Sequence, residues 1–286
     1  MRSSKKQAGK KRHKIIREII VAGATIFVNN KMSFGGSKGR RGSKSKPTSA
    51  AVMRHNDRLA VRNLTMLLNA NFYPGDWFAT LTYEEAVSPE QARRDIENFV
   101  RRMKREYKKL GKEFYYIHVT EYENKRIHHH IVMNYIDAGI INRQWKCGMV
   151  RLTGLDRTRN YKDLAEYMIK ETQKTFRHPD NATRRRWNGS RNLKRPVMKR
   201  EIVDARTLNE EEPKPFKGYA IDPDSIHRYE HPFTGMEHVE YMMYSTDPVP
   251  RIRTWRKGRI VDRQETYHRA GEIQIDMSML DGWSFV

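Results

Sequence analysis

Three consecutive histidines, His128-His129-His130, open an apolar run and are residues whose type and spacing suit metal binding. In a β-strand successive side chains point to opposite faces, so His128 and His130 share one face while His129 points to the other. Two imidazoles placed in this way can chelate one ion. Isolated histidines are often surface or core residues, so the surrounding sequence has to support a metal site.

A carboxylate is expected beside the two outer histidines. Residues 114–121 (FYYIHVTE) and 127–134 (IHHHIVMN) both have strand composition, and the polar segment between them favours an antiparallel hairpin. With the turn centred in that segment, Glu121 lies opposite His128 on the same face. Glu121, His128 and His130 would leave coordination positions open, which suits Mg²⁺ or Mn²⁺ holding a phosphate oxygen.

A tyrosine and a lysine follow on a predicted helix. Residues 161–175 show helical spacing of apolar side chains, and the i to i+3 separation places Tyr167 and Lys170 on one helical face. A phenol attacks phosphorus only when the developing charge is stabilised, which a metal ion and Lys170 would do. The structural alternative is a half-buried tyrosine and a solvated lysine, so only the combination with the histidines is informative.

The elements that must position these side chains are visible in the apolar patterns. They are a helix over residues 54–69, strands over 76–83 and 148–152, and a helix from the capping sequence Ser88-Pro89-Glu90-Gln91 to Gly111. These patterns predict an α+β fold with a mostly antiparallel sheet of about five strands that carries the histidines. Helices are expected on one face, and the tyrosine helix across the metal site.

Composition indicates a polyanionic partner. The chain has 286 residues, with 56 Lys and Arg against 34 Asp and Glu, which gives a formal net charge of +22. Such an excess favours nucleic acid as the partner. A single cysteine, Cys147, cannot form an internal disulfide and indicates a reduced compartment such as the cytoplasm.

Three segments are predicted along the chain. Residues 1–50 form a basic, flexible N-terminal arm and linker, residues 51–176 a catalytic domain, and residues 177–286 a basic linker with a C-terminal extension of uncertain fold. The apolar run at 19–28 resembles the core of a signal peptide, but Arg17 and Glu18 interrupt it. No apolar run is long enough for a membrane span.

Basic residues around a tryptophan predict a further DNA contact. Cations bind phosphates and an aromatic ring can stack on a base, whereas a solvated basic linker is the alternative. The residues concerned are Arg184, Arg185, Arg186, Trp187, Arg191, Lys194 and Arg195. The N-terminal arm would add salt-sensitive, sequence-independent affinity. The chain contains no phosphate-binding loop of the Walker type, so no helicase or ATPase activity is expected within it.

In this order the motifs resemble those of the HUH endonucleases, and specifically of rolling-circle replication initiators. Residues 78–83 (FATLTY) resemble the first motif, residues 128–133 (HHHIVM) the second, and residues 167–170 (YMIK) the third. The resemblance spans about residues 63–176. A weaker likeness at residues 190–196 is to the domain shared by filamentous-phage gene II-type proteins and bacterial mobile elements.

The resemblance implies a role for each motif residue. Tyr167 would be the nucleophile and Lys170 an assisting cation, with His128 and His130 as metal ligands and Glu121 as the third. Thr80 and Thr82 of the first motif would help to position the site or the DNA, although β-propensity alone explains both threonines. Conjugative relaxases carry their tyrosine before the histidines, so the order here argues against them, and Tyr161 lies on another part of the helix, which leaves a single-tyrosine enzyme.

The activity implied is site-specific DNA nicking and strand transfer by a rolling-circle replication initiator of a plasmid, phage or other mobile element. Its substrate would be single-stranded or unwound origin DNA, in hairpin form, with a 5′-phosphotyrosine intermediate, a free 3′-hydroxyl, and a host helicase and polymerase as partners. No small-molecule cofactor other than the metal ion is expected. Two alternatives stay open: a single-tyrosine transposase of the same superfamily, and a basic DNA-binding protein without catalysis.

Overall fold

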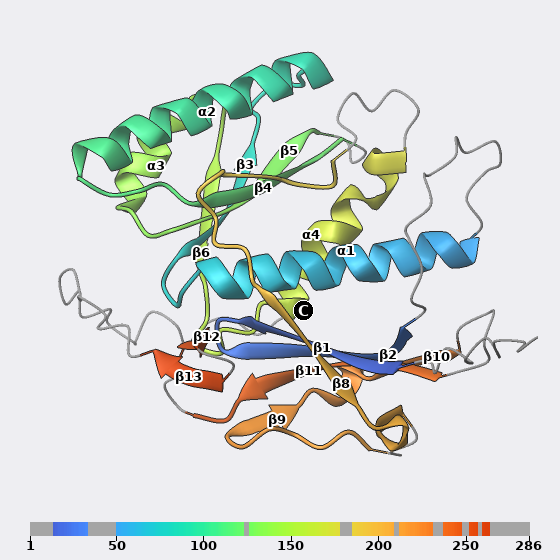
Figure 1. Cartoon of the computed structure of the whole chain (residues 1–286). Coiled ribbons are helices and arrows are strands. Elements are labelled where there is room, and N and C mark those ends of the chain that lie inside the picture. The colour runs from blue at the N-terminus through green and yellow to red at the C-terminus, as the bar shows by residue number, and fades with distance from the viewer. Residues whose placement is uncertain are drawn as a thin grey trace, which may run out of the picture.

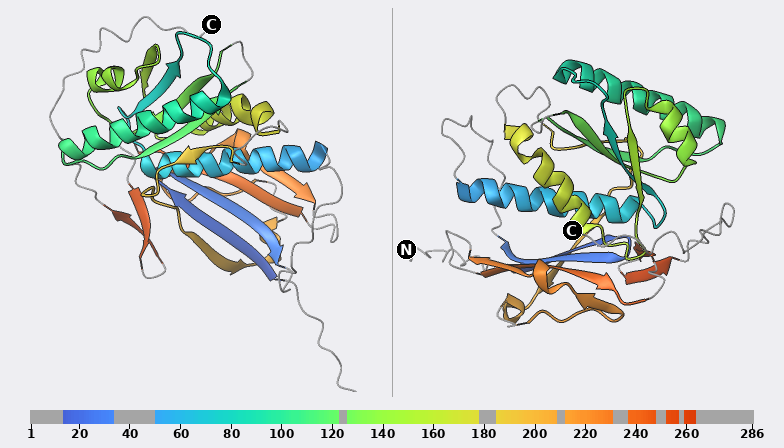
Figure 2. Two further views of the ribbon diagram at one scale, coloured as in Figure 1. Left: turned by 90° about the horizontal axis from the view of Figure 1, so that it is seen from above. Right: turned by 180° about the vertical axis from the view of Figure 1, so that it is seen from behind.

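The computed structural model describes residues 14–33, 50–122, 126–177, 185–208, 212–230, 237–247, 252–256 and 259–263. These residues form stacked layers (Figure 1). Two helices lie outermost, followed by a five-stranded sheet, then two further helices, and then a six-stranded sheet. The view from behind shows the same order of layers (Figure 2).

The five-stranded sheet is antiparallel throughout and has the order β6-β3-β5-β4-β7. Its strands are β3 (Trp77–Thr82), β4 (Tyr116–Glu121), β5 (His128–Met133), β6 (Val150–Gly154) and β7 (Asn188–Gly189). The predicted α+β class and the sheet of about five antiparallel strands are therefore confirmed. The expected turn between β4 and β5 falls on residues 123–125, outside the described residues.

Helices cover both faces of this sheet. On one face lie α2 (Pro89–Lys109) and α3 (Ala138–Gln144), and on the other lie α1 (Ala50–Asn71) and α4 (Lys162–Arg177). Helix α2 begins as its sequence predicts, because the Ser88 hydroxyl accepts a hydrogen bond from the Gln91 amide. Helix α1 was predicted over residues 54–69, but it lies on the face of α4 and not with α2 and α3: its residues Leu64 and Leu68 pack with Met168 of α4 in the same apolar core.

Residues 14–33 differ from the prediction of a flexible arm. They form two strands, β1 (Lys14–Ala22) and β2 (Thr25–Ser33), which pair in an antiparallel hairpin. Alternation of side chains places Ile20 and Phe27 against α1, while Ile19 and Val28 face the opposite side of the sheet, where a second core covers them. Residues 1–13 and 34–49 of the predicted arm and linker lie outside the described residues.

The hairpin belongs to a six-stranded antiparallel sheet. The order is β10-β11-β2-β1-β8, and β9 pairs with β11. The later strands are β8 (Met198–Val203), β9 (Tyr219–Ile221), β10 (His227–Glu230) and β11 (Glu237–Ser245), accompanied by short 3₁₀ turns at Ala205–Leu208 and Pro223–Ser225. Much of the predicted C-terminal extension of uncertain fold is thus the other half of the sheet that the N-terminal hairpin begins.

The turn of the hairpin abuts α1. Gly23 has a φ of 58°, and a Cβ atom at this position would lie 1.9 Å from the backbone carbonyl oxygen of Asn69. Only glycine permits both the turn and this close approach. The Asn69 side chain also donates to the Thr25 hydroxyl at 2.8 Å and accepts from the Tyr161 amide at 2.9 Å. Helix α1 is therefore tied to the six-stranded sheet and to the start of α4.

A separate hairpin completes the described chain. Strands β12 (Ile252–Arg256) and β13 (Arg259–Arg263) pair only with each other among the described residues. Among the helices that the structure describes, none combines the length and the apolar character needed to cross a membrane.

Candidate metal centre and tyrosine site

The strand register brings the three expected ligands together. Glu121 at the end of β4 is opposite His128 at the start of β5, as the hairpin pattern predicted. His130 follows on the same face, and the potential ligand atoms of the three residues all lie within 4.8 Å of one another. Glu121 and His130 are buried and His128 is partly exposed. One ion can reach all three side chains from the face that carries α4.

Hydrogen bonds orient both imidazoles. The His128 Nδ1 lies 3.2 Å from the backbone carbonyl oxygen of Arg126, which can only accept, so this nitrogen carries the hydrogen. The His130 Nδ1 lies 3.2 Å from the Thr80 hydroxyl. With each Nδ1 occupied, the Nε2 atoms are the ones free to ligate, an arrangement common around metal-binding histidines.

The donor set fits a cation. The His128 Nε2 lies 3.0 Å from the Glu121 Oε2, and in the tautomer fixed by Arg126 both atoms bear lone pairs. Two acceptors at this distance are stabilised only by a proton or a metal ion between them. Burial and the neighbouring His128 lower the pKa of His130 to about 4, so His130 is neutral and able to ligate at neutral pH.

The middle histidine has a different environment. His129 is fully buried on the opposite face of β5, where its Nε2 lies 2.9 Å from the Tyr83 hydroxyl and its Nδ1 lies 2.8 Å from the Thr120 hydroxyl. The Trp145 ring contacts it edge-on. Burial lowers the pKa of His129 well below its usual value. Both ring nitrogens are therefore used within the core.

Tyr167 lies directly against the metal-ligand cluster. Its hydroxyl is 3.2 Å from the His130 Nε2, and its ring contacts both His130 and Phe78 edge-on. Phe78 in turn stacks on the His130 ring with centroids 5.5 Å apart. Tyr167 is 42% exposed, so part of this residue faces solvent. Burial, with the charges of Glu171 and Glu121, raises its pKa.

The other predicted residues around the tyrosine occupy different places. Lys170 is exposed on α4, one turn beyond Tyr167. The Thr80 hydroxyl touches His130, whereas the Thr82 hydroxyl donates to the Met149 carbonyl oxygen at 3.3 Å. Thr80 therefore contacts a potential ligand, and Thr82 ties β3 to the segment before β6.

Arg151 is a residue that the sequence did not single out. It is opposite Thr80 in the pairing of β6 with β3, and Thr80 is opposite His130 in the pairing of β3 with β5. The three side chains thus lie in one row on the metal face. Arg151 is exposed, and its charge acts on Tyr167 by lowering the pKa of the phenol. The alternation of side chains in a strand shows which face a cation such as Arg151 occupies. It indicates a site only once the order of the strands is known.

The residues of the basic segment after α4 differ in burial. Arg184 lies outside the described residues. Arg186 lies 2.5 Å from Asp57 of α1 in a largely buried ion pair, and Trp187 packs against the core shared by α1, α4 and β4. These two side chains therefore have structural contacts of their own. Exposed cations remain along this segment at Arg185, Arg191, Lys194 and Arg195.

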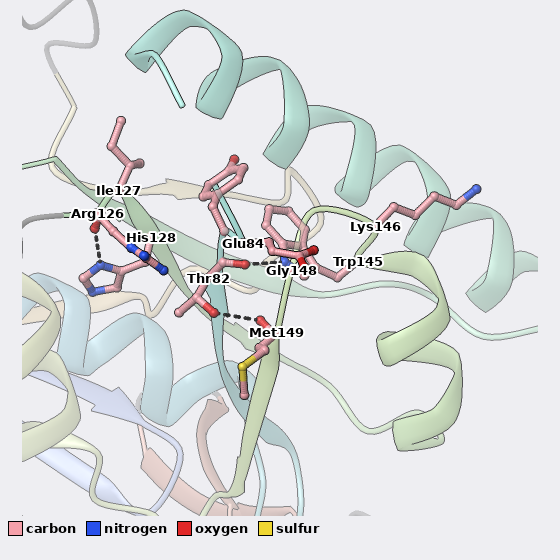
Figure 3. Close-up of a pocket in the computed structure, with 10 residues that line it drawn as sticks. Thr82, Glu84, Arg126, Ile127, His128, Trp145, Lys146, Gly148 and Met149 are labelled. Carbon is pink, nitrogen blue, oxygen red and sulfur yellow. Dashed lines mark hydrogen bonds between the residues drawn. The ribbon is translucent and has the colours of Figure 1, made fainter. Parts of the chain in front are cut away.

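A pocket adjoins the metal centre. It has a volume of about 700 Å³ and lies where the end of β3, the start of β5 and residues 145–149 meet (Figure 3). His128 forms part of its wall, so the pocket and the candidate metal site share a residue. Arg126 and Lys146, both exposed, bring positive charge to its lining.

Comparisons with known proteins agree with the geometry. Residues 76–176 match the model of a family described as replication-associated proteins of the ORF2 and gene II protein type. This range runs from β3 to α4 and contains the three candidate ligands and Tyr167. Searches of curated proteins and of solved structures found no match. The similarity supports a replication initiator that acts on DNA, and residues 76–176 are the part of the chain that carries it.

Proposed function

We propose that this chain is a rolling-circle replication initiator of the HUH type, which nicks single-stranded or unwound origin DNA and joins the strand again. The observation that carries the proposal is the distance of 3.2 Å between the Tyr167 hydroxyl and the His130 Nε2. It puts a solvent-accessible phenol beside the atoms of Glu121, His128 and His130 that can hold a divalent ion. The match to a replication-associated family supports DNA as the substrate.

Tyr167 is the nucleophile in this proposal. Its oxygen attacks the scissile phosphorus, a Tyr167–phosphate bond forms, and the bond from phosphorus to the 3′-oxygen breaks. The phenolic proton passes to solvent, and the departing 3′-oxygen takes up a proton to become a free 3′-hydroxyl. The 5′-phosphate stays on Tyr167, and the reverse attack by a 3′-hydroxyl rejoins DNA and releases the enzyme.

Glu121, His128 and His130 would hold a divalent ion, Mg²⁺ or Mn²⁺, and the bound ion would supply positive charge for the phosphate and the phenolate. Thr80 fixes the ring of His130. Burial raises the pKa of Tyr167 and so disfavours the phenolate, which nearby positive charge would offset. Arg151, in the row with Thr80 and His130, and Lys170, on the tyrosine helix, contribute cations for the phosphate.

The test is covalent capture. The protein is incubated with a randomised library of labelled single-stranded DNA and Mn²⁺, and adducts that survive denaturation are counted. Wild type and Tyr135→Phe should form the adduct, whereas Tyr167→Phe should form none. Tyr135 is a matched control because it is 40% exposed, close to the 42% of Tyr167, but lies beyond the opposite end of β5. DNA binding without any adduct would instead identify a non-catalytic DNA-binding protein.

A further inference from the structure

The pocket beside His128 is part of the folded framework. The Trp145 indole donates to the Thr82 carbonyl oxygen at 2.9 Å, and the Thr82 amide donates to the Met149 carbonyl oxygen at 3.0 Å. A third bond joins the Glu84 amide to the Cys147 carbonyl oxygen at 2.9 Å. These bonds hold residues 145–149 against the end of β3. The pocket is therefore formed before any ligand enters, which lowers the entropic cost of binding.

A glycine makes this arrangement possible. A Cβ atom on Gly148 would lie 2.4 Å from the Thr82 carbonyl oxygen and 2.7 Å from the Glu84 backbone nitrogen. Both neighbours are backbone atoms that cannot turn aside, so only glycine allows the segment to approach β3 so closely. Gly148 itself lines the pocket, together with Lys146 and Met149 from the same segment.

The lining has the chemistry of a nucleotide site. Met149 is 79% exposed, and a thioether is a favourable contact for the face or edge of an aromatic ring. Arg126 and Lys146 supply positive charge for a phosphate, and Glu84 can accept a hydrogen bond from an exocyclic amine. An apolar contact with cations around it suits a flat base that carries an anionic backbone. The volume of about 700 Å³ is within the range of small-molecule sites.

The position of the pocket indicates which nucleotide of the DNA it would bind. His128 belongs both to the pocket wall and to the candidate metal triad, so a phosphate at the triad leaves the neighbouring nucleotide at the pocket. Resting on the function proposed above, we infer that the pocket binds the unpaired base of a nucleotide that flanks the scissile phosphate. The base would leave the DNA stack and pack on Met149, which would fix the position of the cut along the strand.

An abasic scan with matched variants tests the inference. Once the library has yielded a cleaved sequence, oligonucleotides that lack the base at one position each, within three nucleotides of the cut, are compared for affinity and adduct formation. The affinity of the wild type should fall about tenfold when the base at one flanking position is missing. Met149→Ala should weaken the intact oligonucleotide about three- to tenfold and should lose its sensitivity to that position. Met198→Ala, with a methionine 41% exposed on β8, should behave as wild type.

The outcomes separate the two proposals. An adduct whose abasic profile is the same in Met149→Ala as in wild type would overturn the pocket assignment and leave the nicking function intact. The pocket assignment would be supported if Met149→Ala lost its sensitivity to the missing base while Met198→Ala kept it. No adduct with any DNA would overturn the function and the pocket assignment together. Because Met149 is exposed, its replacement should leave the fold unchanged, and thermal unfolding of each variant checks this.

Discussion

The two faces of β5 place the same residue type in two different environments. On one face His129 is enclosed in the core and both of its ring nitrogens meet hydroxyl groups. On the other face His128 and His130 are each held through Nδ1, and their Nε2 atoms point to a carboxylate and a phenol. The difference shows that the residue type alone does not make a metal ligand. To act as a ligand, a histidine also needs a hydrogen bond that fixes one ring nitrogen. Its other ring nitrogen must point to a place where a cation can bind.

The largest effect is expected from His128→Ala. It removes one of the three potential ligands, so metal affinity should fall steeply and adduct formation by about a thousandfold or more. The fold should be retained because His128 is only partly buried. Calorimetric titration with Mn²⁺ and the adduct assay measure the two quantities. EDTA should produce the same loss in wild type. Unchanged nicking in the variant would remove the metal assignment.

At the neighbouring residue, His129, a substitution should lower the stability and leave metal binding intact. His129→Leu removes the imidazole that the hydroxyl groups of Tyr83 and Thr120 both contact in the core, so the free energy of unfolding should fall by about 2–4 kcal/mol. Urea unfolding measures it. Below the unfolding transition the variant should still bind Mn²⁺ with nearly wild-type affinity. A variant that lost metal binding while keeping its stability would contradict the division between the faces.

Acid should destabilise the metal-free protein between pH 6.5 and about 4. Burial lowers the pKa of His118 and of His130 to about 4, and that of His129 well below its usual value. The unfolded chain therefore takes up protons at these histidines in a range where the native state does not, and stability present above pH 6.5 is lost as the pH falls. Burial raises the pKa of Asp76 to about 6. The native state therefore takes up a proton at Asp76 in part of this range, and this one proton opposes the effect of the three histidines.

Urea unfolding at a series of pH values measures this loss, which should amount to a few kcal/mol. His118 stacks on Tyr116 on the face opposite the metal ligands, so His118→Leu should flatten the pH dependence without changing Mn²⁺ affinity. A stability that does not change over this range would show that the histidines are not buried as neutral groups.

A smaller effect is expected from Thr80→Val, which keeps the shape of the side chain and removes the hydroxyl beside the His130 Nδ1. Loss of such a partner lowers metal affinity by about 10- to 100-fold, and a saturating Mn²⁺ concentration should restore adduct formation. Thr82→Val is the matched control, since its hydroxyl contacts the Met149 carbonyl oxygen and no ligand. Equal metal affinities in the two variants would contradict the role given to Thr80.

Local patterns predicted which of the candidate side chains share a face of the sheet. The alternation of strand side chains separated His129 from its neighbours, and the hairpin pattern placed Glu121 opposite His128, as the register shows. The helix start at Ser88 likewise followed from adjacent residues. These features depend on contacts within a few residues or across one short turn, which a sequence displays directly.

Features that depend on distant contacts were missed. Strand β1 pairs with β8 about 180 residues later, and the basic composition around the hairpin favoured the prediction of a flexible arm. Arg151 becomes part of the metal face only through the strand order β6-β3-β5. Arg186 was singled out from a basic segment, and its ion pair with Asp57 of α1 depends on tertiary structure. In each case the partner could not be identified from local sequence.

The central claim is that Tyr167 carries the DNA. The adduct formed by wild-type protein is digested with protease and nuclease, and the peptide that bears the nucleotide is identified by mass spectrometry. The expected result is a single modified residue, Tyr167, joined through its hydroxyl oxygen to the 5′-phosphate of the cleaved strand, with a free 3′-hydroxyl on the other fragment. A nucleotide on any other residue, or cleavage that leaves no protein attached, would contradict the claim.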